Sequence, residues 1–331
     1  MEKMTSRLAA AVVTAGVTVL AVACAAAPAG GHPSAAAASP ALPNPFTVLA
    51  RHSAKSLGLD HPDALAIGPD GSLYVTDFSQ RVTVISPGGK VLRRWGKPGA
   101  GPGEFRFITN DPTTPTDVAG KVAVGRTGMV YVSDSGNGRV QVFTPQGRFI
   151  RQFGSYGSGK GQFFSPGNLV IDGSGNVYVA DNQNQTLAKF SPAGKVIWRI
   201  GGSASSDPDL LGSKEPGSID AHGRIVMVND DQGRVFYVDP SGHKVDAFSP
   251  SVPPGGHVCE VTVDAAGDTY VAGCGPNPPA RVYDRSHRLV AEWPGSKYSL
   301  QTSPVFGPNG EVFALATDGS ILRLRITLPA R

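Results

Sequence analysis

Two histidines, His61 and His257, stand in matching places in the sequence, each ten residues before the glycine of a recurring phrase. A carboxylate follows each of them within three residues, Asp63 in one case and Glu260 in the other. Imidazole and carboxylate groups are common ligands of divalent metals. A structural zinc site takes four ligands, however, and no third histidine stands at a matching place. These residues therefore support two interpretations, a metal site and a solvated polar surface, and we expect no resident metal or other cofactor.

Other motifs that perform catalysis are absent from the sequence or incomplete. The chain has no Gly-x-Ser-x-Gly turn and no Ser, His and Asp in the order of a hydrolase triad. Residues 154–161 nearly match a phosphate-binding loop, but Gly161 follows Lys160 where the motif has Ser or Thr, and no helix signal comes after it. An Asp and an Arg recur together, as at Asp134 and Arg139, and such repetition favours a structural role. We therefore identify no catalytic residue.

The three cysteines predict two different modifications. Cys259 and Cys274 flank Ala266 and Gly267, and if those two residues form the hairpin turn, the cysteines lie directly opposite each other on adjacent strands. Such a pair is within reach of a disulfide, which an exported protein can form. Two buried free thiols are the alternative. The third cysteine, Cys24, belongs to the N-terminal segment described below.

The elements that would position these residues come from an internal repeat. An apolar strand, a glycine and a second strand with a central aromatic recur six times, as in Gly71-Ser-Leu-Tyr-Val-Thr-Asp77. A third strand, a turn that often reads Pro-x-Gly and a fourth strand with an aromatic complete most copies. This period is typical of the four-stranded blades of a propeller. The repeat glycines are Gly71, Gly128, Gly175, Gly223, Gly267 and Gly310.

The two ends of the repeat region predict how a ring of blades would close. The sixth copy lacks its fourth strand, because the chain stops soon after residues 321–326. An unpaired strand instead stands first, at residues 46–52, and resembles the fourth strand at residues 91–95. We expect this N-terminal strand to complete the last blade, since a ring without such a pairing would leave an open sheet edge.

At residues 46–326 the chain resembles the NHL-repeat family of six-bladed propellers. The resemblance is sharpest over Gly128–Phe163, with Tyr-Val-Ser-Asp-Ser-Gly-Asn-Gly-Arg-Val-Gln-Val-Phe at residues 131–143, and looser in the last three copies. It implies an all-β fold of six four-stranded antiparallel blades. It implies no single function, because the family includes scaffolds, RNA binders, kinase sensor domains and lyases.

In such a propeller the segments that lead into the first strand of each blade build the mouth of the central channel. We expect the ligand-binding residues there. The main hypothesis is a non-catalytic module that binds a peptide, glycan or protein partner. The alternative is a metal-dependent lyase or lactonase that holds its ion at the two histidines, as propeller enzymes of these classes do. The candidate residues are His61, Asp63, Asp117, Asn168, His257 and Glu260.

Composition and charge exclude several classes of protein. The 331 residues include 42 glycines and 28 prolines, which favours short strands joined by turns over long helices. The formal net charge of +4 is small for this length, and an exported protein meets little RNA, so we expect no nucleic-acid partner. Contact between basic outer strands and anionic envelope polymers is a weaker alternative. We expect a monomer.

The N-terminal segment predicts export. Lys3 and Arg7 precede an apolar run over residues 8–23, which is typical of a secretory signal. Leu20-Ala-Val-Ala-Cys24 resembles the lipobox of bacterial lipoproteins, apart from Ala21, and implies a lipid on Cys24; cleavage without lipidation is the alternative. We divide the chain into a signal peptide (1–23), an Ala/Pro/Gly-rich tether (24–45), a propeller (46–326) and a tail (327–331). The expected location is extracytoplasmic, either anchored to the cell membrane through Cys24 or secreted.

Overall fold

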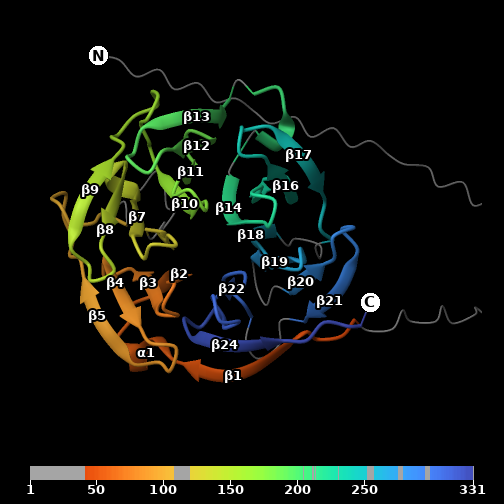
Figure 1. Cartoon of the computed structure of the whole chain (residues 1–331). Helices are drawn as coiled ribbons and strands as arrows, with labels where there is room; N and C mark the ends of the chain where they lie inside the picture. The colour runs from red at the N-terminus through yellow and green to blue at the C-terminus, as the bar shows by residue number, and fades with distance from the viewer. Residues whose placement is uncertain are drawn as a thin grey trace, which may run out of the picture. The chain divides into compact units, whose positions relative to one another are not determined.

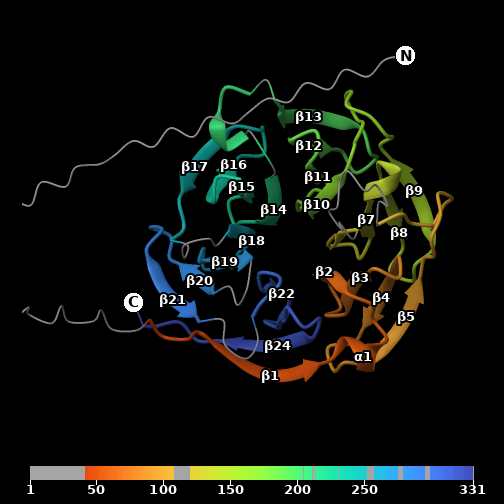
Figure 2. The ribbon, with the colours of Figure 1, turned by 180° about the vertical axis from the view of Figure 1, so that it is seen from behind.

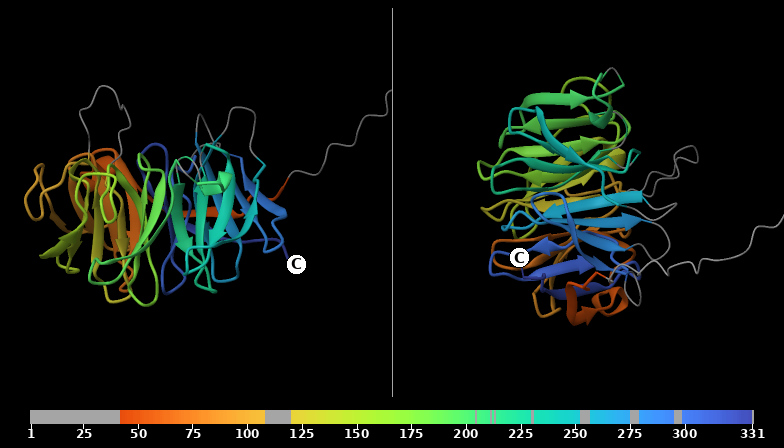
Figure 3. Two further views of the ribbon diagram at one scale, coloured as in Figure 1. Left: turned by 90° about the horizontal axis from the view of Figure 1, so that it is seen from above. Right: turned by 90° about the vertical axis from the view of Figure 1, so that its right-hand side faces the viewer.

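The computed structural model describes residues 42–107, 120–203, 205–210, 212, 214–229, 231–251, 257–274, 279–294 and 299–330. These residues belong to one compact unit, Leu42–Arg331. The unit is a ring of six four-stranded antiparallel sheets, which Figures 1 and 2 show from its two faces and Figure 3 from two sides. The expected six-bladed all-β propeller is thereby confirmed. Cys24 and Asp117 lie outside the described residues.

Each of the first three blades follows the chain from the central axis to the rim (Figure 1). Blade 1 contains β2 (Pro62–Ile67), β3 (Leu73–Asp77), β4 (Arg81–Ile85) and β5 (Val91–Trp95). Blade 2 contains β6 (Val122–Val124), β7 (Val130–Asp134), β8 (Arg139–Phe143) and β9 (Phe149–Phe153). Blade 3 contains β10 (Pro166–Ile171), β11 (Val177–Asp181), β12 (Thr186–Phe190) and β13 (Val196–Gly201).

Blades 4 and 5 repeat this order, and blade 6 takes its outer strand from the other end of the chain. Blade 4 contains β14 (Lys214–Ile219), β15 (Ile225–Asn229), β16 (Arg234–Val238) and β17 (Lys244–Phe248). Blade 5 contains β18 (His257–Val263), β19 (Thr269–Cys274), β20 (Ala280–Tyr283) and β21 (Leu289–Trp293). Blade 6 contains β22 (Val305–Phe306), β23 (Val312–Leu315), β24 (Ile321–Ile326) and β1 (Phe46–His52).

The closure of the ring by the N-terminal strand is confirmed. Strand β1 pairs with β24 in antiparallel register, from Phe46 opposite Ile326 to His52 opposite Ile321. Figure 1 shows these two strands side by side at the rim, one from each end of the chain. The pairing satisfies the edge of β24, which would otherwise be open.

The repeat glycines act as the sequence predicts, because all six have a positive φ, between 78° and 84°. Each closes a five-residue hairpin loop; in blade 1 the Gly68 N–H donates to Ser72 O and the Gly71 N–H donates to Gly68 O. A residue without a side chain adopts this left-handed conformation at little cost. The turns therefore end the inner strand of every blade at the same face of the ring.

The hydrophobic core consists of six clusters, one at each junction between neighbouring blades. Strand residues that alternate along each sheet pack against the blade on either side. Between blades 1 and 2, for example, Tyr74 and Val84 meet Val132 and Phe143. The Asp134–Arg139 pair is structural, as expected: the Arg139 Nε donates to Asp134 Oδ2 at 2.7 Å, and both side chains are buried.

Helices are few and short among the described residues of this unit. The α-helix α1 (Ala54–Leu57) follows β1, and two 3-10 turns, η1 (Ser135–Asn137) and η2 (Pro208–Leu210), lie in connections. Within the described part of the chain, no helix combines the length and the apolar character needed to cross a bilayer.

Candidate functional site

A group of polar residues lies toward the beginning of the six inner strands, seven or eight residues before the repeat glycine of each blade. The inner strands carry β-bulges at this level in several blades; in blade 1, Asp63 lies in the bulge between Pro62 and Ala64. A bulge turns side chains toward the axis that a regular strand would direct elsewhere. We call this group the axial cluster; it consists of Asp63, Lys121, Asn168, Glu215, Glu260 and Ser303.

Contacts within the axial cluster link neighbouring blades in pairs. The Lys121 Nζ of blade 2 lies 2.6 Å from the Asp63 Oδ2 of blade 1, and only 16% and 18% of these side chains is exposed. The Glu215 carboxylate of blade 4 accepts the Asn168 N–H of blade 3 at 3.1 Å. The cluster therefore joins blades across the mouth of the channel, and its single lysine has a carboxylate in direct contact.

A second donor reaches Glu215 from blade 3, where the Asn182 Nδ2 lies 2.5 Å from the Glu215 Oε1. The Glu260 carboxylate of blade 5 accepts the Ser303 N–H of blade 6 at 3.0 Å. All three carboxylates of the cluster thus have partners supplied by the chain itself.

The axial cluster has more carboxylates than cations, and this imbalance shifts its protonation. Burial raises the pKa of Glu260 to about 7, and the favourable charge of Lys121 only partly opposes that effect. Burial also raises the pKa of Glu215. Burial alone would lower the pKa of Lys121, but Asp63, Glu260 and Glu215 together outweigh it and raise that pKa, so the lysine stays charged.

Beyond the axial cluster, the channel continues between the six inner strands as a cavity of about 410 Å³. Its wall is mainly aliphatic, with residues such as Leu65, Val122, Leu169 and Val263. Arg126, Asp172 and Asp220 line it near the hairpin turns. The channel is thus apolar along its length, with charged groups toward both ends.

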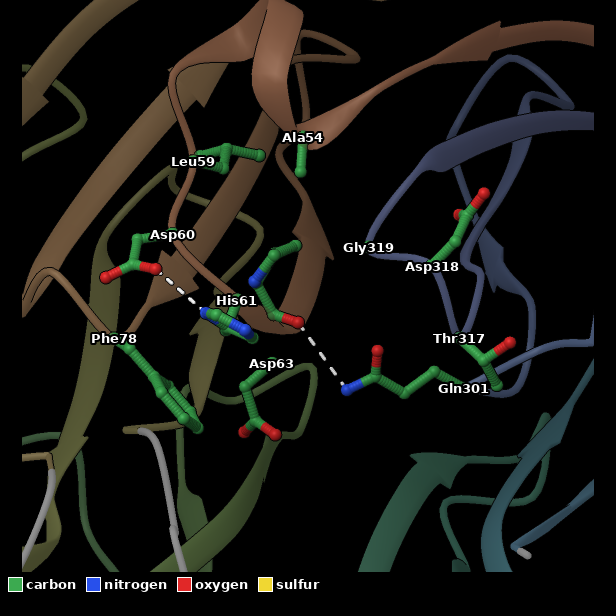
Figure 4. Close-up of a pocket in the computed structure, with 11 residues that line it drawn as sticks. Ala54, Leu59, Asp60, His61, Asp63, Phe78, Gln301, Thr317, Asp318 and Gly319 are labelled. Atoms are coloured by element: carbon green, nitrogen blue, oxygen red, sulfur yellow. Dashed lines mark hydrogen bonds and ion pairs between the residues drawn. The ribbon is translucent and has the colours of Figure 1, made fainter. Parts of the chain in front are cut away.

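A cleft of about 550 Å³ opens between blades 1 and 6 at the mouth of the channel, and Figure 4 shows its lining. Its volume lies within the usual range of ligand sites. Asp60, His61 and Phe78 lie on the blade 1 side, and Gln301 and Thr317 lie opposite them on the blade 6 side (Figure 4). Ala54, Leu59, Pro62, Asp63, Asp318 and Gly319 complete the wall. Because Asp63 belongs to both, the cleft adjoins the axial cluster.

His61 has an unusual conformation in this cleft. Its φ of 46° lies in the left-handed region, which few residues other than glycine adopt, although histidine, asparagine and aspartate do so more often than the others. The His61 Nδ1 lies 2.8 Å from the Asp60 Oδ1, and the imidazole stacks on Phe78 with the ring centroids 5.5 Å apart (Figure 4). About four-fifths of the His61 side chain is nevertheless exposed, at 79%. The ring is therefore held in place and accessible to a ligand.

The structure brings some of the predicted site residues together and leaves others apart. Asp63, Asn168 and Glu260 all contribute to the axial cluster, and His61 lines the adjoining cleft. His257 is exposed in the first position of β18, and no described contact joins it to His61. Among the described residues, no three His, Cys, Asp or Glu side chains gather as a metal site.

The predicted register of the two cysteines is wrong. The loop between β18 and β19 has five residues, from Asp264 to Asp268, so Cys274 lies opposite His257 and Cys259 falls in a bulge before Glu260. Cys259 is disulfide-bonded, but the side chain of Cys274 is outside the described part of the chain, so their pairing stays a prediction.

Two central residues, Lys121 and Glu215, were not predicted. Lysine is not a common metal ligand, so the search for metal-binding residue types did not select Lys121. Glu215 stands in the fourth copy of the repeat, which matches the repeat pattern only weakly. A signal was nevertheless present, because counting back seven or eight residues from each repeat glycine selects all six members of the axial cluster.

Comparison with known proteins agrees with this fold. Residues 119–197 match a family described as a 6-bladed beta-propeller. Mouse peptidyl-glycine alpha-amidating monooxygenase is 36% identical over 121 residues, which make up 33% of this chain and 11% of that protein. The RING finger protein nhl-1 of Caenorhabditis elegans is 51% identical over 43 residues, 13% of this chain and 4% of that protein. The chain therefore spans about a tenth or less of the length of these relatives.

Solved structures match over most of the chain. Virginiamycin B lyase from Staphylococcus aureus is similar with a TM-score of 0.57 at 14% identity, covering 85% of this chain and all of that one. A streptogramin B lyase is similar with a TM-score of 0.57 at 12% identity, covering 86% and 98%. Sequence identity this low shows only that the fold is shared. With its six closed blades and its match to nhl-1, the chain is an NHL-like six-bladed β-propeller.

Proposed function

We propose that this chain is an exported binding module, anchored by a lipid on Cys24, that binds a peptide segment of a partner in the cleft between blades 1 and 6. The observation that carries the proposal is the cleft itself, which combines an accessible volume of about 550 Å³ with apolar and acidic side chains. Phe78 offers apolar surface, and Asp60, with 60% of its side chain exposed, offers a carboxylate. A peptide with a basic side chain next to an apolar one fits such a lining better than an uncharged glycan does.

The chemistry of the axial cluster favours binding over catalysis. A general base must be able to reach the proton that it removes, yet all three carboxylates of the cluster already accept bonds from the chain. A lysine nucleophile must lose its proton, and Lys121 is held in its charged form. The axial cluster is therefore better suited to orient a charged ligand than to remove a proton from it.

The binding proposal is tested with a library of fluorescein-labelled tetrapeptides and fluorescence anisotropy. We expect peptides that pair Lys or Arg with an aromatic residue to bind most tightly. Asp60→Asn should weaken the binding of these peptides by about fivefold, which is the effect of removing one partly exposed charge. The matched control is Asp246→Asn, which removes a carboxylate from the outer strand of blade 4. No binding by any peptide class, or equal losses in both variants, would refute the proposal.

A metal-dependent lyase is the second candidate, because His61 is accessible and its imidazole is held by the Asp60 carboxylate, as the ring of a metal-ligating histidine commonly is. The fold that this chain shares with virginiamycin B lyase is compatible with it. Elemental analysis of protein purified without chelator separates the two candidates. One equivalent of zinc or calcium that disappears in the double variant His61→Ala, His257→Ala would favour the enzyme, and less than about a tenth of an equivalent would favour the binding module.

A further inference from the structure

One reverse turn packs on the repeat glycine in five of the six blades. In blade 1 this turn joins β4 to β5, and its Pro87 Cγ lies 3.5 Å from the place that a Cβ on Gly71 would take. In blade 5 the side chain of Arg285 stands there instead, with its Nε 3.0 Å from a Cβ placed on Gly267. A reverse turn between the third and fourth strands therefore covers the hairpin turn of its own blade. The same packing recurs in blades 2 to 4, with Pro145 at 2.9 Å, Pro192 at 3.4 Å and Pro240 at 3.7 Å.

Blade 6 has no such turn, because β24 and β1, its third and fourth strands, come from opposite ends of the chain. A Cβ placed on Gly310 would meet no described atom within 4 Å. A groove of about 860 Å³ lies at this place, and we call it the blade 6 groove. Residues 264–266 and 307–310, in the hairpin turns of blades 5 and 6, line it together with β24 and β1. The position that a turn fills in the other blades is therefore open among the described residues.

The blade 6 groove has an accessible apolar wall. Leu49 lies in the β-bulge of β1, and 45% of this residue is exposed. Phe306 and Leu328 also line the groove, and both are partly exposed. A proline ring packed against these side chains would remove apolar surface from water. The wall is therefore suited to the kind of residue that fills the same position in blades 1 to 4.

The three carboxylates in the groove wall are engaged by the chain itself or buried. Asp264 Oδ1 accepts the Asp268 N–H at 2.9 Å, and Asp264 Oδ2 accepts the Tyr270 hydroxyl at 3.0 Å. Glu311 Oε2 accepts the Asn309 N–H at 3.0 Å. Asp268, the third acidic residue, is buried, with 2% exposed. These groups therefore offer little free acceptor capacity to a ligand in the groove.

The arginines of the groove leave one positive charge accessible. Arg323 and Arg325 both lie on β24. Hydrogen bonds from the backbone lower the pKa of Glu311, and the positive charge of Arg323 contributes to that shift. Arg325 is exposed, and none of the ion pairs among the described residues includes it. A carboxylate on a ligand can pair with Arg325, so the groove favours a partner that is both apolar and acidic.

The turn of blade 4 shows which sequence combines an apolar and an acidic group in this packing. It reads Asp239-Pro-Ser-Gly242, and its proline covers Gly223 as described above. Asp239 Oδ1 accepts the Ser241 N–H at 2.8 Å, which holds the turn. Asp239 Oδ2 lies 3.4 Å from the His243 Nδ1. One carboxylate oxygen therefore shapes the turn, and the other is placed for a basic partner.

We propose that the blade 6 groove binds a turn of this kind, Asp-Pro-x-Gly, on the surface of a partner protein. The proline of the partner packs over Gly310 against Leu49, and its aspartate pairs with Arg325. The groove lies at the hairpin-turn face of the ring, whereas the mouth cleft lies at the other end of the inner strands, so both sites can be occupied at once. The proposal therefore does not rest on the ligand of the mouth cleft.

A cyclic peptide that carries this turn tests the proposal on the full chain. It has the sequence of residues 238–244, with Ala in place of His243 and a trifluoroacetyl group on Lys244, and D-Pro-Gly closes the ring. Binding is followed by the broadening of its fluorine NMR signal. We expect a Kd of roughly 0.1–1 mM, because one turn buries little surface. Leu49→Glu should weaken binding by at least about tenfold, since it places a carboxylate in the apolar wall.

The matched control is Leu92→Glu. Leu92 lies in the corresponding bulge of β5 with 43% exposed, and it is not among the residues of the groove wall. This variant should bind the peptide as the parent does. A second pair of changes tests the charge. Arg325→Gln, or Asn in place of the peptide's Asp, should each weaken binding by about threefold, and the two together should weaken it no further.

Several results would overturn the proposal. No broadening at about 2 mM protein, or equal losses in Leu49→Glu and Leu92→Glu, would mean that the groove does not bind the turn. Broadening that persists in Leu49→Glu but is lost in Asp60→Asn would assign the peptide to the mouth cleft. A dimer in sedimentation that Leu49→Glu dissociates would assign the groove to a second copy of the chain.

Discussion

Replacing Glu260 with Gln should stabilise the protein in mild alkali and change little in mild acid. Glu260 is largely enclosed by the axial cluster, and its pKa is raised from 4.5 to about 7. A carboxyl group with a raised pKa binds more protons in the folded state than in the unfolded state between these two values. The free energy of unfolding therefore falls as the pH rises through this window, and the full penalty applies above pH 7.

The size of this effect follows from the shift. The pKa of Glu260 in the folded protein lies about 2.5 above its ordinary value, and this difference corresponds to about 3 kcal/mol at 1.36 kcal/mol for each pKa unit. Gln keeps an oxygen that can accept the Ser303 N–H, so that hydrogen bond is retained. Lys121 loses one of its three carboxylates, which reduces the gain. We therefore expect Glu260→Gln to be about 1–3 kcal/mol more stable than the parent at pH 8.5 and close to it at pH 5.

Urea unfolding followed by tryptophan fluorescence at pH 5, 6, 7 and 8.5 measures this difference. The control is Glu292→Gln, because Glu292 pairs with Arg281 on the outer part of blade 5, away from the axial cluster. The free energy of unfolding of Glu292→Gln should differ from that of the parent by the same amount at every pH. If Glu260→Gln also runs parallel to the parent from pH 5 to 8.5, Glu260 does not titrate in this window and the electrostatic account of the cluster fails.

Three further outcomes follow from the structure. Lys121→Met should lower the free energy of unfolding by about 3–5 kcal/mol at pH 7, because it leaves the carboxylates of the axial cluster without their cation. A loss below about 1 kcal/mol in urea titration would show that Lys121 does not neutralise these carboxylates. Deleting residues 46–52 removes the outer strand of blade 6 and should lower the melting temperature by more than about 10 °C in calorimetry, whereas an unchanged curve would refute closure by this strand. His61→Gly should remove the strain of a left-handed backbone at a residue with a side chain and raise the free energy of unfolding by about 0.5–1 kcal/mol. The same variant should bind peptide more weakly. A less stable variant would show that the conformation of His61 carries no strain.

The sequence predicts the repeating parts of the fold well because the same local physics acts six times. Each repeat glycine needs a left-handed backbone, and each lies in a hairpin loop of the same form. The strand at residues 46–52 could be assigned to the last blade because the count of strands leaves one missing at one end and one spare at the other. The period of the repeat and the need to pair the open edge of the last sheet together determine this part of the structure.

The details of register could not be predicted as well. The cysteine pairing depended on a two-residue turn, but the loop from Asp264 to Asp268 has five residues with the glycine in its fourth position. A bulge at Cys259 then shifts the strand once more. Hairpin loops of different lengths share the same glycine signal, so the glycine alone does not fix which residues face each other.

The candidate site was predicted in part for a related reason. Asp63, Asn168 and Glu260 lie in the first part of inner strands, and topology places all such positions toward the channel mouth. Lys121 was missed because its role is to neutralise carboxylates from other blades, a relation that only the closed ring creates. The mouth cleft likewise depends on Gln301 and residues 317–319 coming next to residues 59–63, at the junction of the first and last blades.

Photo-crosslinking of a partner at the mouth cleft tests the central claim most directly. A benzophenone amino acid is placed at Thr317, which lines the cleft, and in a second protein at Arg126, which lines the far end of the channel. The best-binding labelled peptide from the tetrapeptide library is the probe. We predict a covalent adduct with the Thr317 protein alone, which unlabelled peptide suppresses. An adduct only at Arg126, or adducts of equal yield at both positions, would contradict a ligand site between blades 1 and 6.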